Sequence, residues 1–322
     1  MKLHTGSDNF IRPGIGSWVS YGLGTENANL PAFVTICPTL AFGGVNNWSS
    51  SFLPAVHNGT ALGDASVPSE KAQVKFIQNS KLPRQIQQLQ LDRLNAMNRR
   101  HLSQSGGDAS LEARINSFEL AFRMQSSIPQ LEDLSRETPA TLKLYGMDDP
   151  GTANFGRMCL LARRFAEAGV RFIQVTHNDD KVQWDQHNNL KRDHEKNAAE
   201  VDLPIAGLLT DLKQRGMLDD TLIWWGSEFG RTPTAETEDG RDHNPEGFTM
   251  WLAGGGVKGG FRYGSTDDYG YYAAENKVHI HDFHATMLHA MGLDHERLTY
   301  RHAGRDFRLT DVEGNVVHEL FA

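Results

Sequence analysis

Short apolar runs alternate along the chain with longer segments in which hydrophobic positions recur at helical spacing. The apolar runs are rich in β-branched and aromatic residues, which is typical of buried strands, and they occupy residues 31–39, 170–176, 221–226 and 248–253. The periodic segments place their apolar residues along one side, as amphipathic helices do, and they occupy residues 82–105, 110–127, 155–168, 189–215 and 281–291. The pattern therefore predicts strands interleaved with helices.

The order of these elements indicates an α/β fold. Helices and strands alternate from residue 152 onward, and this order predicts parallel strands joined by right-handed crossovers. We expect a mostly parallel central sheet sandwiched between helices, in a single domain over residues 1–322, with a helical excursion at about 70–130. Residues 1–30 are punctuated by Gly, Pro and Asn, and residues 40–69 lack periodicity, so both segments are predicted as loops.

Composition narrows the class of protein. Hydrophobic residues make up 39% of the chain and charged residues 22%, and no apolar run is long enough to span a bilayer. A net charge of −8 argues against a nucleic-acid partner, which requires a basic surface. Cys37 and Cys159 are expected to be buried thiols rather than a disulfide or a metal pair. The first residues, MKLHTGSDNF, lack the apolar core of a signal peptide, so the chain as written is expected to stay in the cytoplasm, and to be exported if its N-terminus is longer.

The polar loop between the last two predicted strands is the first candidate for chemistry. In an open α/β sheet, ligands bind at the carboxyl ends of the strands, where this loop is expected to lie. Within a short span it carries carboxylates, guanidiniums and an imidazole, namely Glu228, Arg231, Arg241, Asp242 and His243.

A second polar loop follows the strand predicted at residues 170–176. Asp185 and His187 stand two residues apart, so an extended backbone would direct both side chains to one side. Mixed carboxylate and imidazole ligands suit zinc, manganese or iron better than calcium, although the divalent ion stays open among zinc, manganese and calcium. The alternative is a set of ordinary solvated loop residues. The metal-type ligands of this loop are His177, Asp179, Asp180, Asp185, His187, Asp193 and His194.

Arg231 and Arg241 flank the carboxylates of the last polar loop. A guanidinium can clamp two oxygens of a phosphate or sulfate and neutralise charge in the transition state. The alternative is an ion pair with a carboxylate of the same loop, such as Glu228, Glu236 or Asp242. The two interpretations stay open from the sequence.

A histidine cluster marks the start of the final predicted helix. Capping and packing are the favoured interpretation of its members, with metal ligation as the alternative. The cluster consists of His279, His281, Asp282, His284 and His289. No G-x-S-x-G elbow and no Walker loop occurs in the chain, so neither a serine-hydrolase triad nor a P-loop is indicated.

Several runs resemble the DUF1501 family, whose proteins are similar to sulfatases within the alkaline-phosphatase-like superfamily. The resemblance covers essentially the whole chain and is carried by RPGIGSWVSYGLGTENANLPAF, WDQH, GSEFGRTP, GRDHNPEGFTMWLAGGGVKGG and HDFHATMLHAMGLDHERLTYRHAGRDFRLTD. It implies a central, mostly parallel sheet between helices, a metal at the strand ends, and ester hydrolysis as the ancestral chemistry.

The resemblance also implies roles for particular residues. Asp185, His187 and His243 resemble the ligands of one metal site, and Glu228 stands where the superfamily places an Asp ligand of a second site. Phe229 replaces the histidine of that second site and cannot ligate a metal. In the superfamily the nucleophile precedes a Thr-Gly pair that resembles Thr5 and Gly6, so the resemblance implies an N-terminally truncated chain.

The resulting hypothesis is a metal-dependent hydrolase of sulfate or phosphate esters. Arg231 and Arg241 would hold the anion, and the loss of the nucleophile segment is expected to impair catalysis. The partners would be a small anionic ester or a sulfated glycan, with neither a nucleic acid nor a membrane. The alternative is a catalytically inactive sulfatase-like fold that binds an anion, a sulfated glycan or a protein partner.

Overall fold

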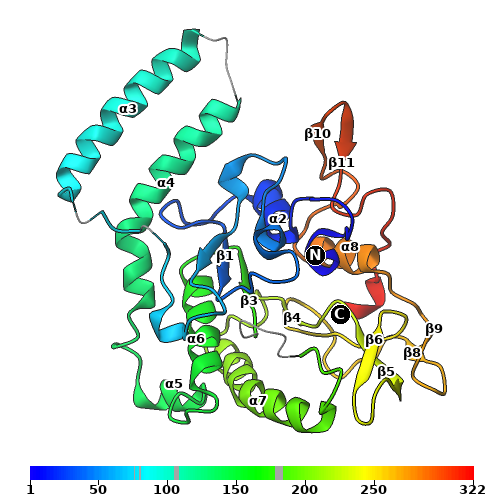
Figure 1. Ribbon diagram of the computed structural model, residues 1–322. Coiled ribbons are helices and arrows are strands. Elements are labelled where there is room, and N and C mark those ends of the chain that lie inside the picture. The colour runs from blue at the N-terminus through cyan, green and yellow to red at the C-terminus, as the bar shows by residue number, and fades with distance from the viewer. Residues whose placement is uncertain (76, 80, 105–108, 178–183) are drawn as a thin grey trace.

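A small parallel sheet lies at the centre of the helical part of the protein. The computed structural model describes residues 1–75, 77–79, 81–104, 109–177 and 184–322 (Figure 1). The sheet contains β1 (Phe33–Ile36), β2 (Thr60–Leu62) and β3 (Phe172–Val175) in the order β2-β1-β3. Both β2 and β3 pair with β1 in parallel. The strands expected at residues 31–39 and 170–176 are therefore confirmed, with tighter bounds.

Helices cover both faces of this sheet. On one face, α2 (Ile15–Leu23) packs against the rings of Phe33 and Phe172. On the other face, side chains of β1 join those of α6 (Ala153–Glu167) in a hydrophobic core. Alternate side chains of a strand point to opposite faces, so β1 can be buried on both sides.

Two further helices, one before and one after α6 in the chain, complete this half of the molecule. They are α7 (Leu190–Gln214), which packs on α6, and α5 (Pro139–Leu144), which packs on α7. The helical excursion consists of α3 (Arg84–Gln104) and α4 (Ala109–Glu132), which form a hairpin that projects from the rest of the molecule (Figure 1).

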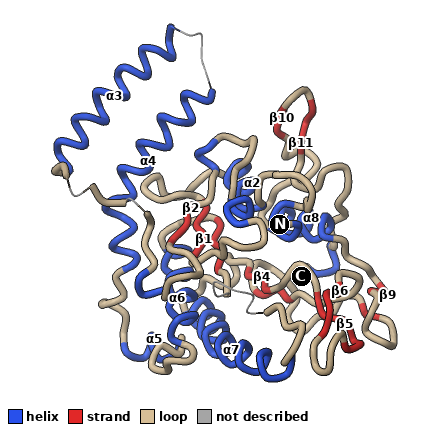
Figure 2. Tube along the Cα trace, in the orientation of Figure 1, coloured by secondary structure: helices blue, strands red, loops and turns tan. Residues whose placement is uncertain are grey.

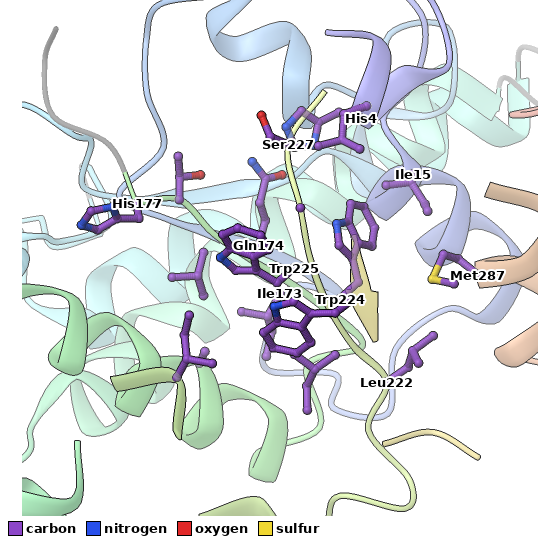
Figure 3. Close-up of a pocket in the computed structure, with 18 of the residues that line it drawn as sticks. His4, Ile15, Ile173, Gln174, His177, Leu222, Trp224, Trp225, Ser227 and Met287 are labelled. Carbon is purple, nitrogen blue, oxygen red and sulfur yellow. The ribbon is translucent and has the colours of Figure 1, made fainter. Parts of the chain in front are cut away.

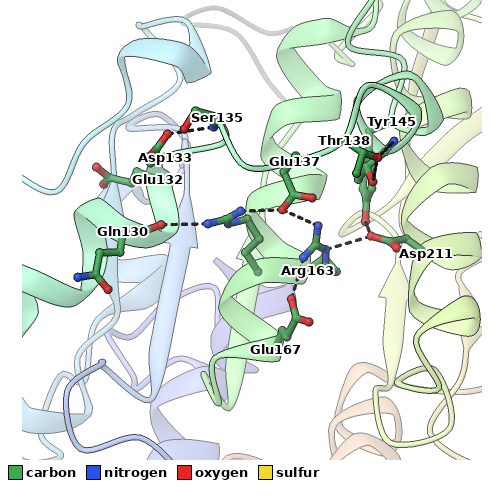
Figure 4. A network of polar contacts seen from close by, with 12 residues as sticks. Gln130, Glu132, Asp133, Ser135, Glu137, Thr138, Tyr145, Arg163, Glu167 and Asp211 are labelled. Atoms are coloured by element: carbon green, nitrogen blue, oxygen red, sulfur yellow. Dashed lines mark hydrogen bonds and ion pairs between the residues drawn. The ribbon is translucent and has the colours of Figure 1, made fainter.

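A buried ion network fixes α6 against its neighbours (Figure 4). The guanidinium of Arg163 lies 2.8 Å from Glu137, 2.7 Å from Glu167 and 3.0 Å from Asp211 on α7, and the Tyr145 hydroxyl donates to Asp211. The contact with Asp211 Oδ2 is an ion pair rather than a well-aligned hydrogen bond, since Arg163 Nε lacks a hydrogen-bond partner. Glu137 also pairs with Arg164, and Asp211 with Arg215, so each buried carboxylate has two cationic partners.

The second half of the molecule is built from antiparallel pairs and one helix (Figure 2). β4 (Ile223–Trp225) pairs with β7 (Trp251–Ala253), and α8 (Ile280–Ala290) packs nearby, with Trp224 against Phe283. The remaining pairs are β5 (Gly230–Ala235) with β6 (Arg241–Asn244), β8 (Ser265–Thr266) with β9 (Ala273–Glu275), and β10 (Tyr300–His302) with β11 (Arg305–Phe307).

The expectation of one mostly parallel sheet is therefore wrong in part. The protein is a mixed α/β fold, but β4 and β7 are antiparallel rather than joined by a crossover. The physical reason is their connection, residues 226–250, which contains the β5–β6 hairpin and no helix. A helical crossover is what parallel neighbours normally require.

The loop predicted over residues 1–30 is also corrected. This segment contains α1 (Lys2–Thr5) and α2, and most side chains of α2 are buried. In the segment 40–69, also predicted as a loop, β2 and short 3₁₀ turns alternate with irregular backbone. Residues 15–23 contain two glycines, which suggest a loop in a sequence pattern but here permit close packing.

Two further features bear on function. Cys37 and Cys159 are free and buried, as expected, and burial raises the pKa of both thiols. Over the described ranges, no helix has both the length and the apolar character needed to cross a membrane.

Candidate functional site

A cleft of about 1330 Å³ lies between β3 and β4 (Figure 3). Its wall includes Gln174 from β3, and Trp224 and Trp225 from β4. In the described residues β3 pairs only with β1 and β4 only with β7, so the two strands flank the cleft without a shared ladder. The volume of the cleft is larger than the roughly 300–1,000 Å³ typical of a small-molecule pocket, so the cleft has room for a small molecule together with solvent. Where β4 ends, the cleft meets the two polar loops that follow β3 and β4.

The β5–β6 hairpin brings these two loops together. The backbone N–H of Arg241 donates to the carbonyl of Gln186 over 3.3 Å, and the Thr237 hydroxyl donates to the carbonyl of His187 over 2.8 Å. Asp239 accepts from the backbone N–H of Asn189 over 2.8 Å. The hairpin is thus fastened to residues 186–189, about fifty positions earlier in the chain.

A shared carboxylate oxygen organises the side chains at this junction. Asp185 Oδ1 lies 2.7 Å from His243 Nε2, 3.1 Å from His187 Nε2 and 2.5 Å from a guanidinium nitrogen of Arg231. The ligand atoms of Asp185, His187 and His243 all lie within 4.8 Å of one another. Asp185, Arg231 and His243 line the cleft, so the cluster is open to a molecule bound there.

The pKa of Asp185 reflects these contacts. Burial acts to raise it, but the hydrogen bonds from Arg231 and His243 outweigh that effect and hold the pKa of the carboxyl below its usual range. Arg231 also donates to the carbonyls of Trp184 and Arg241 over 2.9 and 3.1 Å. The guanidinium therefore holds Asp185 in place and keeps it ionised.

His187 is oriented by a second carboxylate. Its Nδ1 lies 2.5 Å from Glu236 Oε2, and this hydrogen bond is the main reason why the pKa of His187 is raised. Because Nδ1 donates to Glu236, Nε2 is the nitrogen that a metal ion could bind in exchange for its proton. On the other side of the cluster, Phe229 stacks on His243 with ring centroids 4.0 Å apart.

The donor set fits a divalent metal ion. Two imidazole Nε2 atoms converge on one carboxylate oxygen. Without an ion, ring N–H groups can donate to that oxygen, and a bound divalent cation would replace those protons. The Glu236 carboxylate behind His187 matches the hydrogen-bonded arrangement that usually orients a metal-bound histidine. Two nitrogens and one oxygen, with room for solvent, suit zinc or a similar transition ion.

The other predicted site residues differ in their position relative to the cluster at Asp185. Arg241 lies on β6 two residues before His243, hence on the same face of the strand, and its guanidinium donates to the carbonyl of Gly240. Glu228 lines the cleft but accepts from Ser227 and does not join the three ligand side chains. Asp242 belongs to an overlapping group with His187 and Glu236.

Three of the five described metal-type residues of the earlier loop do not join the cluster. His177 receives a hydrogen bond from Trp184 and contacts Glu200 over 3.1 Å. Asp193 pairs with Arg192, and the ring of His194 packs edge-on against Trp184. Asp179 and Asp180 lie outside the described residues.

Glu236 is a partner of His187 that the sequence pattern did not indicate. The sequence pattern suggests it only as an ion-pair partner for the arginines. The signal that places it correctly is the β5–β6 register, in which Arg231 faces His243 and Ala235 faces Arg241.

Comparisons with known proteins give one match. The family model described as "Protein of unknown function (DUF1501)" matches residues 1–321. No curated protein and no solved structure matches the chain.

Proposed function

The chain belongs to the DUF1501 family, and we propose that it is a metal-dependent hydrolase of small sulfate or phosphate esters. The observation that carries the proposal is the convergence of His187 Nε2 and His243 Nε2 on Asp185 Oδ1 beside the β3–β4 cleft. The similarity to sulfatases noted for the sequence motifs supports the same reaction class. In this proposal Asp185, His187 and His243 hold the ion.

A bound divalent ion would polarise the ester oxygen and lower the pKa of a water molecule that attacks the ester. Arg231 fixes the position of Asp185, because its guanidinium contacts that carboxylate and two backbone carbonyls. Glu236 holds the His187 ring in the tautomer that presents Nε2 to the ion. The ring of Phe229 restricts His243 by stacking on it.

Arg241 is the better placed of the two arginines to bind the substrate anion. Arg231 is occupied by Asp185, whereas the described contact of the Arg241 guanidinium is a hydrogen bond to the Gly240 carbonyl. Since Arg241 and His243 share a face of β6, an anion next to the ion is within the reach of a long arginine side chain. The guanidinium would neutralise the negative charge that builds on a phosphoryl or sulfuryl group.

Metal content and hydrolysis test this proposal together. The purified protein should contain a divalent metal by elemental analysis and should hydrolyse p-nitrophenyl sulfate or p-nitrophenyl phosphate. His243→Ala should lose the hydrolysis and the ion held by Asp185, His187 and His243, and so contain one metal ion per chain fewer than the parent protein. Arg241→Gln should keep the metal and lose about a hundredfold in kcat/KM, the usual cost of removing a group that stabilises transition-state charge.

The matched control is His101→Ala, which removes an exposed histidine from α3 and should change neither property. A protein that neither binds a metal nor cleaves either ester would overturn the proposal.

A second candidate function is anion or sulfated-glycan binding without catalysis. Two residues favour it. Phe229 stacks on His243 and Glu228 accepts a hydrogen bond from Ser227, so neither side chain contributes a ligand to a second metal ion next to the first. In that case the metal-stripped protein should bind a sulfated glycan with unchanged affinity and should show no esterase activity.

A further inference from the structure

Three side chains converge at the start of α8, on the side of the molecule where α1 packs. Glu313 Oε2 lies 3.2 Å from His281 Nδ1 and 3.4 Å from His279 Nδ1. The ligand atoms of His279, His281 and Glu313 all lie within 4.8 Å of one another. None of these residues belongs to the cluster at Asp185.

The hydrogen bonding of His281 fixes which ring nitrogen carries the proton. His281 Nε2 lies 3.0 Å from the carbonyl oxygen of Gly6, and a carbonyl can only accept a hydrogen bond. Nε2 must therefore donate, and in the neutral ring Nδ1 presents its lone pair to the carboxylate of Glu313. Two electron-rich atoms 3.2 Å apart are held together by a proton or a cation between them. A histidine whose other nitrogen donates to a backbone carbonyl is the usual arrangement of a metal ligand.

His279 lies beside the same carboxylate, with its Nδ1 3.4 Å from Glu313 Oε2. Its Nδ1 accepts a hydrogen bond from the backbone N–H of His281, but at 3.4 Å this contact is at the long limit for such a bond. A cation bound at Nδ1 would replace a weak interaction. The rings of His279 and His281 meet edge to face with centroids 5.0 Å apart, so both can reach one ion.

The loop that supplies Glu313 is fixed to α8 by contacts independent of any ion. Asp282 accepts hydrogen bonds from the backbone and side chain of Asn315 over 2.7 and 3.1 Å. Gly314 has a φ of +104° and fits closely against the carbonyl of His281, where an L-residue would be strained. The backbone that carries Glu313 is therefore held against α8 before an ion binds, which lowers the entropic cost of binding.

We propose that His279, His281 and Glu313 form a second metal site, which takes zinc or a similar transition ion. Two imidazoles and one carboxylate form a ligand set that zinc accepts in sites that keep a position open to solvent. The side chains of His279 and Glu313 are both about half exposed, so an ion can reach them from solvent. The bound ion joins α8 to residues 311–317 and, through the Gly6 carbonyl, to the end of α1.

Zinc stoichiometry tests this site independently of the proposed hydrolase centre. The background variant Asp185→Asn/His187→Ala removes two ligands of the cluster at Asp185 and the histidine of the overlapping group with Glu236 and Asp242. After dialysis against micromolar zinc, it should retain about one zinc ion per chain by elemental analysis. Adding either His281→Ala or Glu313→Gln should abolish that remaining zinc. The matched control His289→Ala removes an exposed histidine from the same helix and should leave the zinc in place.

Thermal unfolding separates lost ligation from lost structure. Zinc should raise the Tm of the background variant, because a ligand that binds only the folded state stabilises it. With Glu313→Gln added, the Tm in EDTA should stay unchanged and the zinc-dependent rise should disappear. The proposal is overturned if the background variant binds no zinc, in which case a proton joins His281 to Glu313. Zinc that persists in both His281→Ala and Glu313→Gln overturns it as well.

Discussion

Gly240 occupies the place where the β5–β6 hairpin comes closest to the loop that carries Asp185 and His187. A Cβ atom at position 240 would lie 1.7 Å from the carbonyl oxygen of His187 and 2.2 Å from its carbon. Neither atom can yield, because both belong to the backbone. This close approach sets the positions of the side chains around Asp185. His243 and Glu236 come from the hairpin, whereas Asp185 and His187 come from the loop.

Gly240→Ala should therefore weaken metal binding at Asp185, His187 and His243. The added methyl group must separate the two backbones, which moves His243 and Glu236 away from their partners. We expect a loss of metal affinity of about tenfold or more, the usual effect of disturbing the groups that orient metal ligands. Competition with a chromophoric chelator measures the affinity.

Gly259→Ala provides the control for that substitution. A Cβ atom at Gly259 meets nothing within 4 Å, and its φ is not positive. Equal metal affinities for the two alanine variants would contradict the role assigned to Gly240.

The residues that could be predicted from the sequence are those whose relation is local. Asp185 and His187 stand two apart on one loop, and the structure brings them together with His243. Glu236 lies 49 positions from His187, and their contact depends on how the hairpin docks. Glu228 lies apart from the three ligand side chains and accepts a hydrogen bond from Ser227, which follows from the path of the chain after β4. Spacing along a sequence carries no information about either.

At the scale of elements, α2 shows why local pattern can fail. Gly16 weakens the helical signal, because glycine is a poor helix former. In the fold, however, Gly16 lies where a Cβ atom would come within 2.7 Å of the rings of Phe33 and Phe172. These two rings pack edge to face with centroids 5.1 Å apart. The glycine is a packing requirement of helix on sheet, and that requirement is set by residues far along the chain.

Gly16→Ala is expected to destabilise the protein although alanine favours the helix. Overpacking a core contact costs about 1–3 kcal/mol, while replacing a helical glycine by alanine returns about 1 kcal/mol. The net loss is expected to be at most about 2 kcal/mol in the free energy of unfolding. Urea unfolding measures it as a lower midpoint at constant m-value.

Gly22→Ala in the same helix is the matched comparison. Its nearest neighbours are the methyl groups of Leu293 and Leu298, the flexible ends of side chains that can move aside. This variant should be as stable as the parent protein or more so. If Gly16→Ala proved equally stable, the close packing on Phe33 and Phe172 would not be the reason for the glycine.

The connection between β4 and β7 shows a second limit of the sequence pattern. The apolar runs correctly predicted β3, β4 and β7, but pairing depends on what joins the strands. The polar stretch after β4 has no helical periodicity, and the hairpin within it lets β7 return antiparallel to β4. The sequence could thus predict β4 and β7, whereas their relative direction required the tertiary path of the chain.

At the scale of the whole molecule, α1 and α8 meet through a histidine contact between residues 281 positions apart. The Nε2 of His284 on α8 donates to the carbonyl of Leu3 over 2.8 Å, and its Nδ1 has no hydrogen-bond partner among the described residues. His284 is fully buried. Burial lowers its pKa to about 4, and the positive charges of His281 and His279, when protonated, act in the same direction. Burial also lowers the pKa of His4 to about 3.

Acid should therefore destabilise the fold in a defined pH range. Above pH 6.5, the ordinary pKa of a solvated histidine side chain, His284 is neutral in both the folded and the unfolded chain. As the pH falls below 6.5, the unfolded chain takes up a proton that the folded chain refuses until about pH 4. The stability contributed by neutral His284 is thus present above the unfolded pKa and is lost as the pH falls towards the folded one. The loss amounts to about 3 kcal/mol over this range, and His4 adds a loss of the same sign.

His284→Gln isolates this effect, because the glutamine amide can still donate to the Leu3 carbonyl but does not titrate. Urea unfolding between pH 7 and pH 4, with EDTA to exclude metal binding, should give a free energy of unfolding that declines less steeply for this variant than for the parent protein. The difference between the two should change by about 3 kcal/mol across the range. His101→Gln, which alters an exposed histidine of α3, should follow the parent. Parallel pH profiles for His284→Gln and the parent would mean that His284 becomes protonated within the folded protein, and that the contact between α1 and α8 tolerates a buried charge.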